Sequence, residues 1–256
     1  MLKTWKFELF FKFMYYMFLR YVLNVKTDLT LNNFYGQKII LSNDGWSFNM
    51  LMEILFEDIY KWLSWCNHFL DIWWFIWESG IYFAQNNKKV TIYEADPDNY
   101  KYLVKNVSEL KNIISYNLAV VWDNTQIALF YKNNTNDPWT SHINTIWSKS
   151  FKIQCINYFD IIKNNPDIDG IKIDIEWWEY QIVPQFNEKN FTYKKWQIEF
   201  HDFNEEKHAI IMWFLSLLEN LLYVSQYLDV NWNNINSKEV INCEYSIFTL
   251  YFYKNS

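Results

Sequence analysis

Glycine is scarce in this sequence of 256 residues, which contains 4 glycines, 4 prolines and 3 cysteines. Average usage puts glycine alone at about 7%. The cysteines, Cys66, Cys155 and Cys243, are odd in number, far apart and include no C-x-x-C pair. Their pattern argues against a disulfide framework and a zinc site, and it predicts buried, reduced thiols in a cytoplasmic protein.

An excess of basic residues and long apolar runs are also lacking. The 23 lysines and arginines are outnumbered by 29 acidic residues, which argues against a nucleic-acid partner held by a basic surface. No apolar run reaches the roughly 20 residues needed to cross a bilayer. Charges interrupt residues 1–24, so a signal peptide is not expected either. We expect an amphipathic helix packed on the domain there, with peripheral membrane contact as the alternative.

Tryptophan is abundant where glycine would be expected. Of the 15 tryptophans, Trp73, Trp74 and Trp77 crowd one strand-to-helix turn, and residues 177–178 occupy another. Such turns need the conformational freedom or the close backbone approach that glycine allows. An aromatic-rich core is one explanation, because 21 phenylalanines and 19 tyrosines are also present. We favour the hypothesis that the gene reads UGA as glycine, so that these tryptophans are glycines in the native protein.

Short apolar runs alternate with helical patterns from about residue 68, and 51% of the chain is hydrophobic. This order predicts a doubly wound α/β domain, with a parallel sheet covered by helices on both faces. The expected strands are 69–72, 90–94, 113–120, 125–132, 151–156, 169–176 and 196–201. Expected helices include 52–65, 78–85, one opened by Asp96 and Pro97, and 205–223. We predict an N-terminal extension over residues 1–60 and one domain over residues 61–256.

Two antiparallel hairpins are also predicted. Residues 37–41 and 47–50 flank the turn signal Ser42-Asn43-Asp44-Gly45. Residues 239–254 alternate like a terminal hairpin.

The first candidate site follows the first strand of the domain. Asp71 ends that strand, and glycine at Trp73, Trp74 and Trp77 would restore D-I-G-G-F-I-G-E-S-G. Glycines let backbone N–H groups approach a ligand at a helix N-terminus. Glu94 ends the next strand, where a carboxylate can accept both hydroxyls of a ribose. A packing turn without a ligand is the structural alternative.

The second candidate site lies at two later strand ends. Lys172, Asp174 and Glu176 alternate and therefore project from one face of a strand. Such charges are costly in a central strand unless they are paired or functional, and an ion pair with Lys172 is one explanation. Glu199 and His201 end another strand. Asp174, Glu176, Glu199 and His201 could together hold a divalent cation, but we assign no metal ligand from sequence.

In this order, the segments resemble the FkbM family of S-adenosylmethionine-dependent methyltransferases over about residues 55–203. The matching segments are LDIWWFIWESGIYFA, YEADPDNYKYLVKN, NLAVV, IKIDIEWWEYQIV and IEFH. The corresponding family patterns include D-I-G-A-x-I-G and K-I-D-V-E-G-x-E. The resemblance implies the class I, Rossmann-like fold, with a mostly parallel seven-stranded sheet and a terminal antiparallel hairpin. It also implies methyl transfer to an oxygen of a sugar or another small hydroxylated metabolite.

Carried over by position, the resemblance assigns the amino-acid end of S-adenosylmethionine to Asp71, Trp73 and Trp77, and its ribose to Glu94. It places the acceptor and the methyl group beside Asp174, Glu176 and His201. We expect His201 to be the general base, because an imidazole titrates near neutral pH, and Asp174 or Glu176 to orient the acceptor.

Departures from the family pattern leave two alternatives. Trp73, Trp77 and Trp177 replace family glycines, and genuine indoles at the first two positions would fill the cofactor pocket. The chain would then be a degenerate methyltransferase fold that binds a partner through its aromatic N-terminal segment; UGG codons would favour this, and UGA codons an enzyme. A nicotinamide-dependent oxidoreductase is the second alternative, but it expects G-x-G-x-x-G, whereas the restored turn is D-x-G-x-x-x-G.

Overall fold

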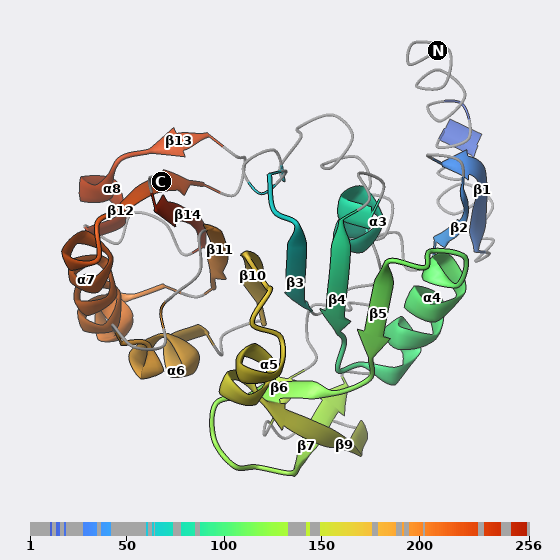
Figure 1. Cartoon of the computed structure of the whole chain (residues 1–256), viewed down its shortest axis with the longest axis horizontal. Helices are drawn as coiled ribbons and strands as arrows, with labels where there is room; N and C mark the ends of the chain where they lie inside the picture. The colour runs from blue at the N-terminus through green and yellow to red at the C-terminus, as the bar shows by residue number, and fades with distance from the viewer. Residues whose placement is uncertain are drawn as a thin grey trace.

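A computed structural model gives the fold of the chain (Figure 1). The residues that it describes are 28–34, 37–41, 65–73, 78–84, 88–132, 149–175, 179–187, 195–201, 203–229, 233–241 and 247–254, with residues 11, 14, 15, 18, 60, 63, 142, 143 and 191. None of the described helices combines the length and the apolar character needed to cross a membrane.

An eight-stranded mixed sheet forms the centre of the molecule, in the order β13-β12-β14-β11-β10-β3-β4-β5 (Figure 1). Its strands are β3 (His68–Trp73), β4 (Lys89–Tyr93), β5 (Ile113–Tyr116), β10 (Gly170–Asp174), β11 (Lys195–Phe200), β12 (Tyr223–Leu228), β13 (Asn234–Ile235) and β14 (Phe248–Lys254). The five strands from β11 to β5 are parallel, and β14 is antiparallel to both of its neighbours. The chain therefore has the predicted α/β architecture, with one strand more than the expected seven because β13 extends the edge.

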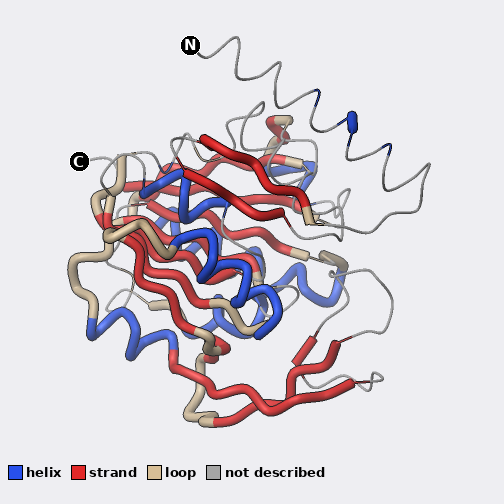
Figure 2. The backbone as a smooth tube through the Cα atoms, turned by 90° about the vertical axis from the view of Figure 1, so that its right-hand side faces the viewer, coloured by secondary structure: helices blue, strands red, loops and turns tan. Residues whose placement is uncertain are grey.

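Helices cover both faces of this sheet, as the alternating pattern predicted (Figures 1 and 2). Successive residues of β3 enter different cores: Phe69 packs in a cluster with α3 and α4, and Leu70 in a cluster with α5, α6 and α7. The helices are α3 (Glu78–Ala84), α4 (Pro97–Val107), α5 (Tyr158–Asn164), α6 (Glu179–Ile182) and α7 (Glu205–Asn220), and the short 3-10 helix Val183–Gln185 follows α6. Every residue of β10 is buried, because the strand lies between these two layers.

The start of α4 agrees with the sequence prediction. Pro97 is the first residue of α4, where its missing N–H costs no hydrogen bond. Asp96 caps the helix by accepting a hydrogen bond from the Asp98 amide at 2.7 Å. Local chemistry is enough to fix this boundary.

A second sheet of four strands, in the order β6-β9-β7-β8, lies next to the first. It contains β6 (Ala119–Val121), β7 (Ile127–Lys132), β8 (His142–Ile143) and β9 (Lys149–Asn157). The expected single strand 113–120 is thus wrong, since it is divided between β5 and β6 of two different sheets. The predicted strands at 125–132 and 151–156 are confirmed as β7 and β9, which pair antiparallel.

The described strands of both predicted hairpins pair with strands other than those expected. Residues 37–41 form β2 (Gln37–Leu41), but β2 pairs with the preceding strand β1 (Leu29–Phe34); residues 42–50 lie outside the described residues. At the C-terminus, the pattern assigned to residues 239–254 contains helix α8 (Ser237–Ile241) and β14, and β14 pairs with β12. Alternation identifies a strand correctly, but it does not identify the strand that pairs with it.

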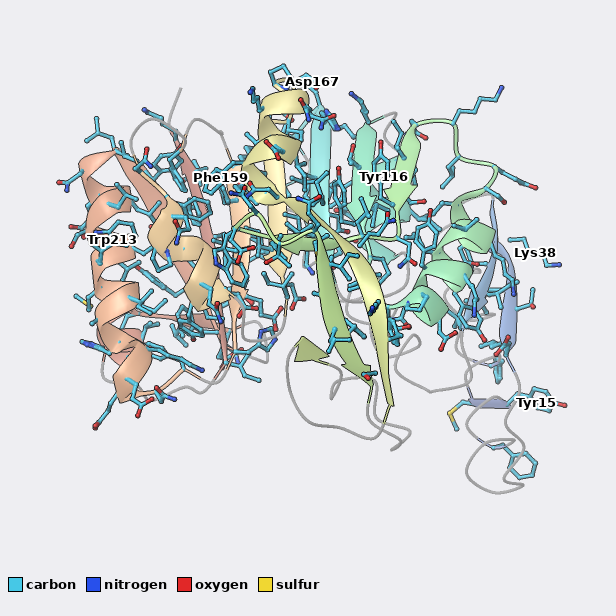
Figure 3. The ribbon with its side chains drawn as sticks, turned by 90° about the horizontal axis from the view of Figure 1, so that it is seen from below. Tyr15, Lys38, Tyr116, Phe159, Asp167 and Trp213 are labelled. Carbon is cyan, nitrogen blue, oxygen red and sulfur yellow. The ribbon has the colours of Figure 1, made fainter. Side chains whose placement is uncertain are left out.

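The described residues of the N-terminal segment do not show the expected packing. Phe11, Met14, Tyr15 and Phe18 are helical, and each side chain is 48–66% exposed. Figure 3 shows Tyr15 directed away from the body of the molecule. Most of the predicted helix at 52–65 lies outside the described residues. Of the cysteines, Cys66 is a buried free thiol, as expected, whereas Cys155 is free but only half-buried. Cys243 lies outside the described part of the chain.

The β1–β2 hairpin is held against α4 by packing and by one asparagine. Ile39 and Leu41 share a buried cluster with Leu103 of α4. Asn106 Oδ1 accepts a hydrogen bond from the Ile40 amide at 2.8 Å, and Asn106 Nδ2 donates to the Ile40 carbonyl at 2.9 Å. The asparagine therefore pairs with the backbone of β2 as a neighbouring strand would.

We predict that Asn106→Leu lowers the free energy of unfolding by about 1–3 kcal/mol, because it leaves two backbone groups of Ile40 without their partner. Urea unfolding followed by circular dichroism measures this change. Ser108→Ala, which alters an exposed residue just after α4, serves as the control. An equal loss in the two variants would contradict the role of Asn106.

Candidate functional site

The candidate site lies at the carboxyl ends of four neighbouring strands of the main sheet. Asp71 is in β3, Glu94 follows β4, Asp174 ends β10 and His201 follows β11. Because these strands are parallel and adjacent, their carboxyl ends share one edge of the sheet. Ligands of open α/β sheets bind at such an edge.

Asp71 connects β3 to the helix that follows it. Its side chain is buried, and its Oδ2 accepts a hydrogen bond from the hydroxyl of Ser79 in α3. Lys172 is its register partner on β10. Burial raises the pKa of the Asp71 carboxyl to about 6; nearby Lys172 and the Ser79 hydrogen bond oppose this shift, and Asp174 adds to it.

Lys172 and Asp174 form a buried ion pair. The distance from Lys172 Nζ to Asp174 Oδ2 is 2.9 Å, and the two side chains are 1% and 4% exposed. The predicted alternation along this strand is confirmed for these two residues, and so is the ion pair that the sequence suggested as one explanation. Among the residues whose side-chain burial the structure describes, Lys172 is the only buried lysine or arginine.

His201 lies between carboxylates from three elements. Its Nδ1 is 3.1 Å from Oε1 of Glu179, the first residue of α6. Its Nε2 is 3.7 Å from Asp174 Oδ1 and also 3.7 Å from Glu199 Oε1. Asp174, Glu179 and His201 are buried, whereas the Glu199 side chain is 22% exposed. The structure therefore brings together Asp174, Glu199 and His201, three residues that the sequence singled out.

Sequence reasoning assigned no role to Glu179. Strand alternation directed attention to Asp174 and Glu176, whereas Glu179 reaches the site from the start of α6. Its Oε1 also accepts a hydrogen bond from the Ile175 amide at 3.2 Å. The available signal was its position, since Glu179 is the final acidic residue of the segment that matches K-I-D-V-E-G-x-E.

Glu94 is fully buried just beyond β4. Its Oε1 accepts a hydrogen bond from the Asp96 amide at 2.7 Å, and its backbone carbonyl accepts one from Asn117 Nδ2 at 2.8 Å. These contacts fix the carboxylate at the strand end where the sequence predicted a ribose contact.

Part of the predicted site cannot be placed. Trp77, Glu176 and Trp177 lie outside the described residues. Trp73 ends β3, and its backbone is in register with Asp174 on β10. Position 73 is therefore next to the ion pair in the sheet, between the predicted cofactor and acceptor ends.

Three of these side chains have the chemistry of metal ligands. One donor atom from each of Asp174, Glu179 and His201 lies within 4.8 Å of the others. However, Glu179 faces Nδ1 of the imidazole, whereas Asp174 faces Nε2. An ion bound to one ring nitrogen would be directed away from one of the two carboxylates, and Lys172 already supplies a cation to Asp174. The arrangement favours an imidazole held between carboxylates over a metal centre.

Comparison with known proteins gives one family match. Residues 67–224 match the model described as the methyltransferase FkbM domain. No curated protein matches the chain.

Several solved structures are distantly similar. Fibrillarin from Aeropyrum pernix, in complex with natively bound S-adenosyl-L-methionine, is 9% identical with a TM-score of 0.39, and the match covers 73% of this chain and 66% of that one. An rRNA methylase from Streptococcus thermophilus is 8% identical with a TM-score of 0.41, covering 79% and 96%. A SAM-dependent methyltransferase from Aquifex aeolicus is 12% identical with a TM-score of 0.39, covering 77% and 87%. These likenesses define no activity for this chain.

The raised pKa of Asp71 predicts a pH dependence of stability. Between its unfolded pKa of 3.8 and its folded pKa of about 6, Asp71 binds a proton more tightly in the folded state. Its stabilising contribution is therefore complete below pH 3.8 and is lost as pH rises to about 6. Relative to Asp71→Asn, the wild-type chain should lose up to about 3 kcal/mol of unfolding free energy between pH 4 and pH 7. Chemical unfolding at both pH values measures this difference, and an equal change in both proteins would exclude the shift.

Proposed function

The chain belongs to the FkbM methyltransferase family, and we propose that it methylates a hydroxyl oxygen of a sugar or another small hydroxylated metabolite, with S-adenosylmethionine as the methyl donor. The family match over residues 67–224 supports the reaction class. The observation that carries the choice of a hydroxyl acceptor is the buried His201, which lies beside carboxylates at the edge of the sheet where a ligand is expected. A hydroxyl acceptor loses its proton in the reaction, and the position of His201 supports our assignment of that proton to its imidazole.

The cofactor would lie across the ends of β3 and β4. The Asp71 carboxylate suits the ammonium group at the amino-acid end, and Glu94 suits the ribose hydroxyls. Trp73 and Trp77 stand at the positions where the family places glycine beside the same end. S-adenosylmethionine supplies a methyl group already activated by its sulfonium, so the protein mainly orients the two reactants and excludes water.

The acceptor would lie at the ends of β10 and β11. We assign proton removal to His201, where Nε2 faces the acceptor and takes up the hydroxyl proton. Asp174 and Glu199, each 3.7 Å from Nε2, stabilise the imidazolium that results. Asp174 also orients the acceptor, as we propose for Glu176. The Glu199 side chain is 22% exposed, so we propose that the acceptor enters from its side.

The same proposal requires space at position 73. This residue ends β3, is in register with Asp174 and lies next to β4, whose end carries Glu94. A bare main chain there would let the cofactor approach the strand end, whereas an indole would occupy that space. We therefore propose that residues 73, 77 and 177 are glycine in the native protein.

We predict that a version carrying Trp73→Gly, Trp77→Gly and Trp177→Gly binds S-adenosylmethionine at least tenfold more tightly than the chain as written. Isothermal titration calorimetry measures both affinities. Trp213→Gly, which removes an exposed indole from α7 (Figure 3), is the control and should have no effect. Equally tight binding by the unaltered chain would contradict the proposed pocket.

In the glycine version, we predict that His201→Ala lowers kcat by about 10²–10⁴-fold, because the acceptor loses its base. Transfer of a radioactive methyl group from S-adenosylmethionine to a panel of mono- and disaccharides identifies the acceptor and measures kcat. The affinity for S-adenosylmethionine should remain unchanged. His208→Ala, on α7, is the matched control, and unchanged turnover in His201→Ala would remove His201 from the mechanism.

A further inference from the structure

We propose that Glu179 is a positioning residue that sets which nitrogen of His201 carries hydrogen and thereby directs Nε2 toward the acceptor. The catalytic consequence rests on the proposed function. The contact between Glu179 and His201 does not, because it is a property of the folded chain.

Glu179 joins the ends of two strands. It begins α6 and is completely buried. Its Oε1 accepts a hydrogen bond from the Ile175 amide, just beyond β10, at 3.2 Å, and lies 3.1 Å from His201 Nδ1, just beyond β11. The backbone contact limits the movement of the carboxylate, so the carboxylate in turn limits the rotation of the imidazole.

This contact determines the tautomer of His201. An ionised carboxylate only accepts hydrogen bonds, so Nδ1 must carry the hydrogen that it donates to Glu179. In the neutral imidazole the lone pair is then on Nε2. Nε2 is the nitrogen nearer to Asp174 and Glu199, on the side assigned to the acceptor.

Of the three carboxylates that the structure describes around His201, that of Glu179 lies closest to the imidazole. Among the described residues, the charged groups that face the ring are Glu179 from α6, Asp174 from β10 and Glu199 from β11, with Lys172 bound to the far oxygen of Asp174. Glu179 Oε1 is 3.1 Å from the ring, compared with 3.7 Å for the other two carboxylates, and Asp174 shares its charge with Lys172. Removing the charge of Glu179 should therefore destabilise the imidazolium more than removing that of Asp174 or Glu199.

The tautomer can be measured without any substrate. The chain contains four histidines, so ¹⁵N-histidine labelling of the full chain gives a spectrum in which His201→Gln assigns the His201 signals. At pH values where the imidazole of His201 is neutral, we expect its hydrogen on Nδ1. Hydrogen on Nε2, or an equal mixture of the two tautomers, would overturn the proposal.

Two substitutions separate the charge of Glu179 from its shape. Glu179→Gln keeps an oxygen that can accept from Nδ1 but removes the charge, so the Nδ1–H tautomer should persist while the imidazole titrates about one pH unit lower. Glu179→Met has a similar volume and no such oxygen, so the tautomer preference should also be lost. Glu219→Gln, at the exposed end of α7, is the control and should change neither.

If Glu179 had only a structural role, Glu179→Gln would leave the pKa of His201 at its wild-type value. That result would refute the assignment. If Glu179→Gln fails to fold, the tautomer of His201 in the wild-type chain still tests the assignment.

In the glycine version, the acidic limb of the plot of kcat against pH should move to lower pH in Glu179→Gln, with an unchanged KM. Loss of methyl transfer in all versions, with the Nδ1–H tautomer intact, would refute the proposed function and leave the assignment of Glu179 standing.

Discussion

The buried ammonium group of Lys172 organises the carboxyl edge of the main sheet. It lies in a central strand, is 1% exposed and contacts Asp174 at 2.9 Å. Asp71 is its register partner on β3, so the one ammonium group interacts electrostatically with carboxyl groups from two strands. Burying a lysine costs several kcal/mol unless such partners compensate, and the same low dielectric strengthens the pairing. The two halves of the site, one assigned to the cofactor and one to the acceptor, meet at this residue.

Local chemistry predicted much of this arrangement. Alternation placed Lys172 and Asp174 on one face of a strand, and the pair Asp96-Pro97 marked the start of α4. The predictions that failed concern the partner of a strand. Residues 37–41 pair with the strand just before them, and residues 248–254 pair with β12, because alternation marks the buried face of a strand and not the strand that lies beside it. Glu179 was missed because its contact with His201 joins α6 to the end of β11, and strand alternation says nothing about such a contact.

The space around the backbone distinguishes the positions that suit glycine from those that suit tryptophan. A Cβ on Gly80 would lie 2.5 Å from Ile92 Cδ1, and one on Gly170 would overlap Cys66 Sγ, so both described glycines stand where the backbone approaches another segment closely. Trp196 is a fully buried indole in the core and makes stacked contacts with both Phe191 and Phe252. The fold therefore contains at least one position that suits tryptophan, whereas position 73, beside Asp174 at a strand end, is where the proposed ligand needs the main chain. Composition alone does not separate these two kinds of position, but their places in the sheet do.

A bare backbone at positions 73 and 77 would give S-adenosylmethionine access to the edge organised by Lys172. Peptide mass spectrometry of the protein isolated from its native host identifies those two residues as they are made in the cell. We expect glycine at both positions. Tryptophan at both positions, in material that holds S-adenosylmethionine tightly, would contradict this expectation.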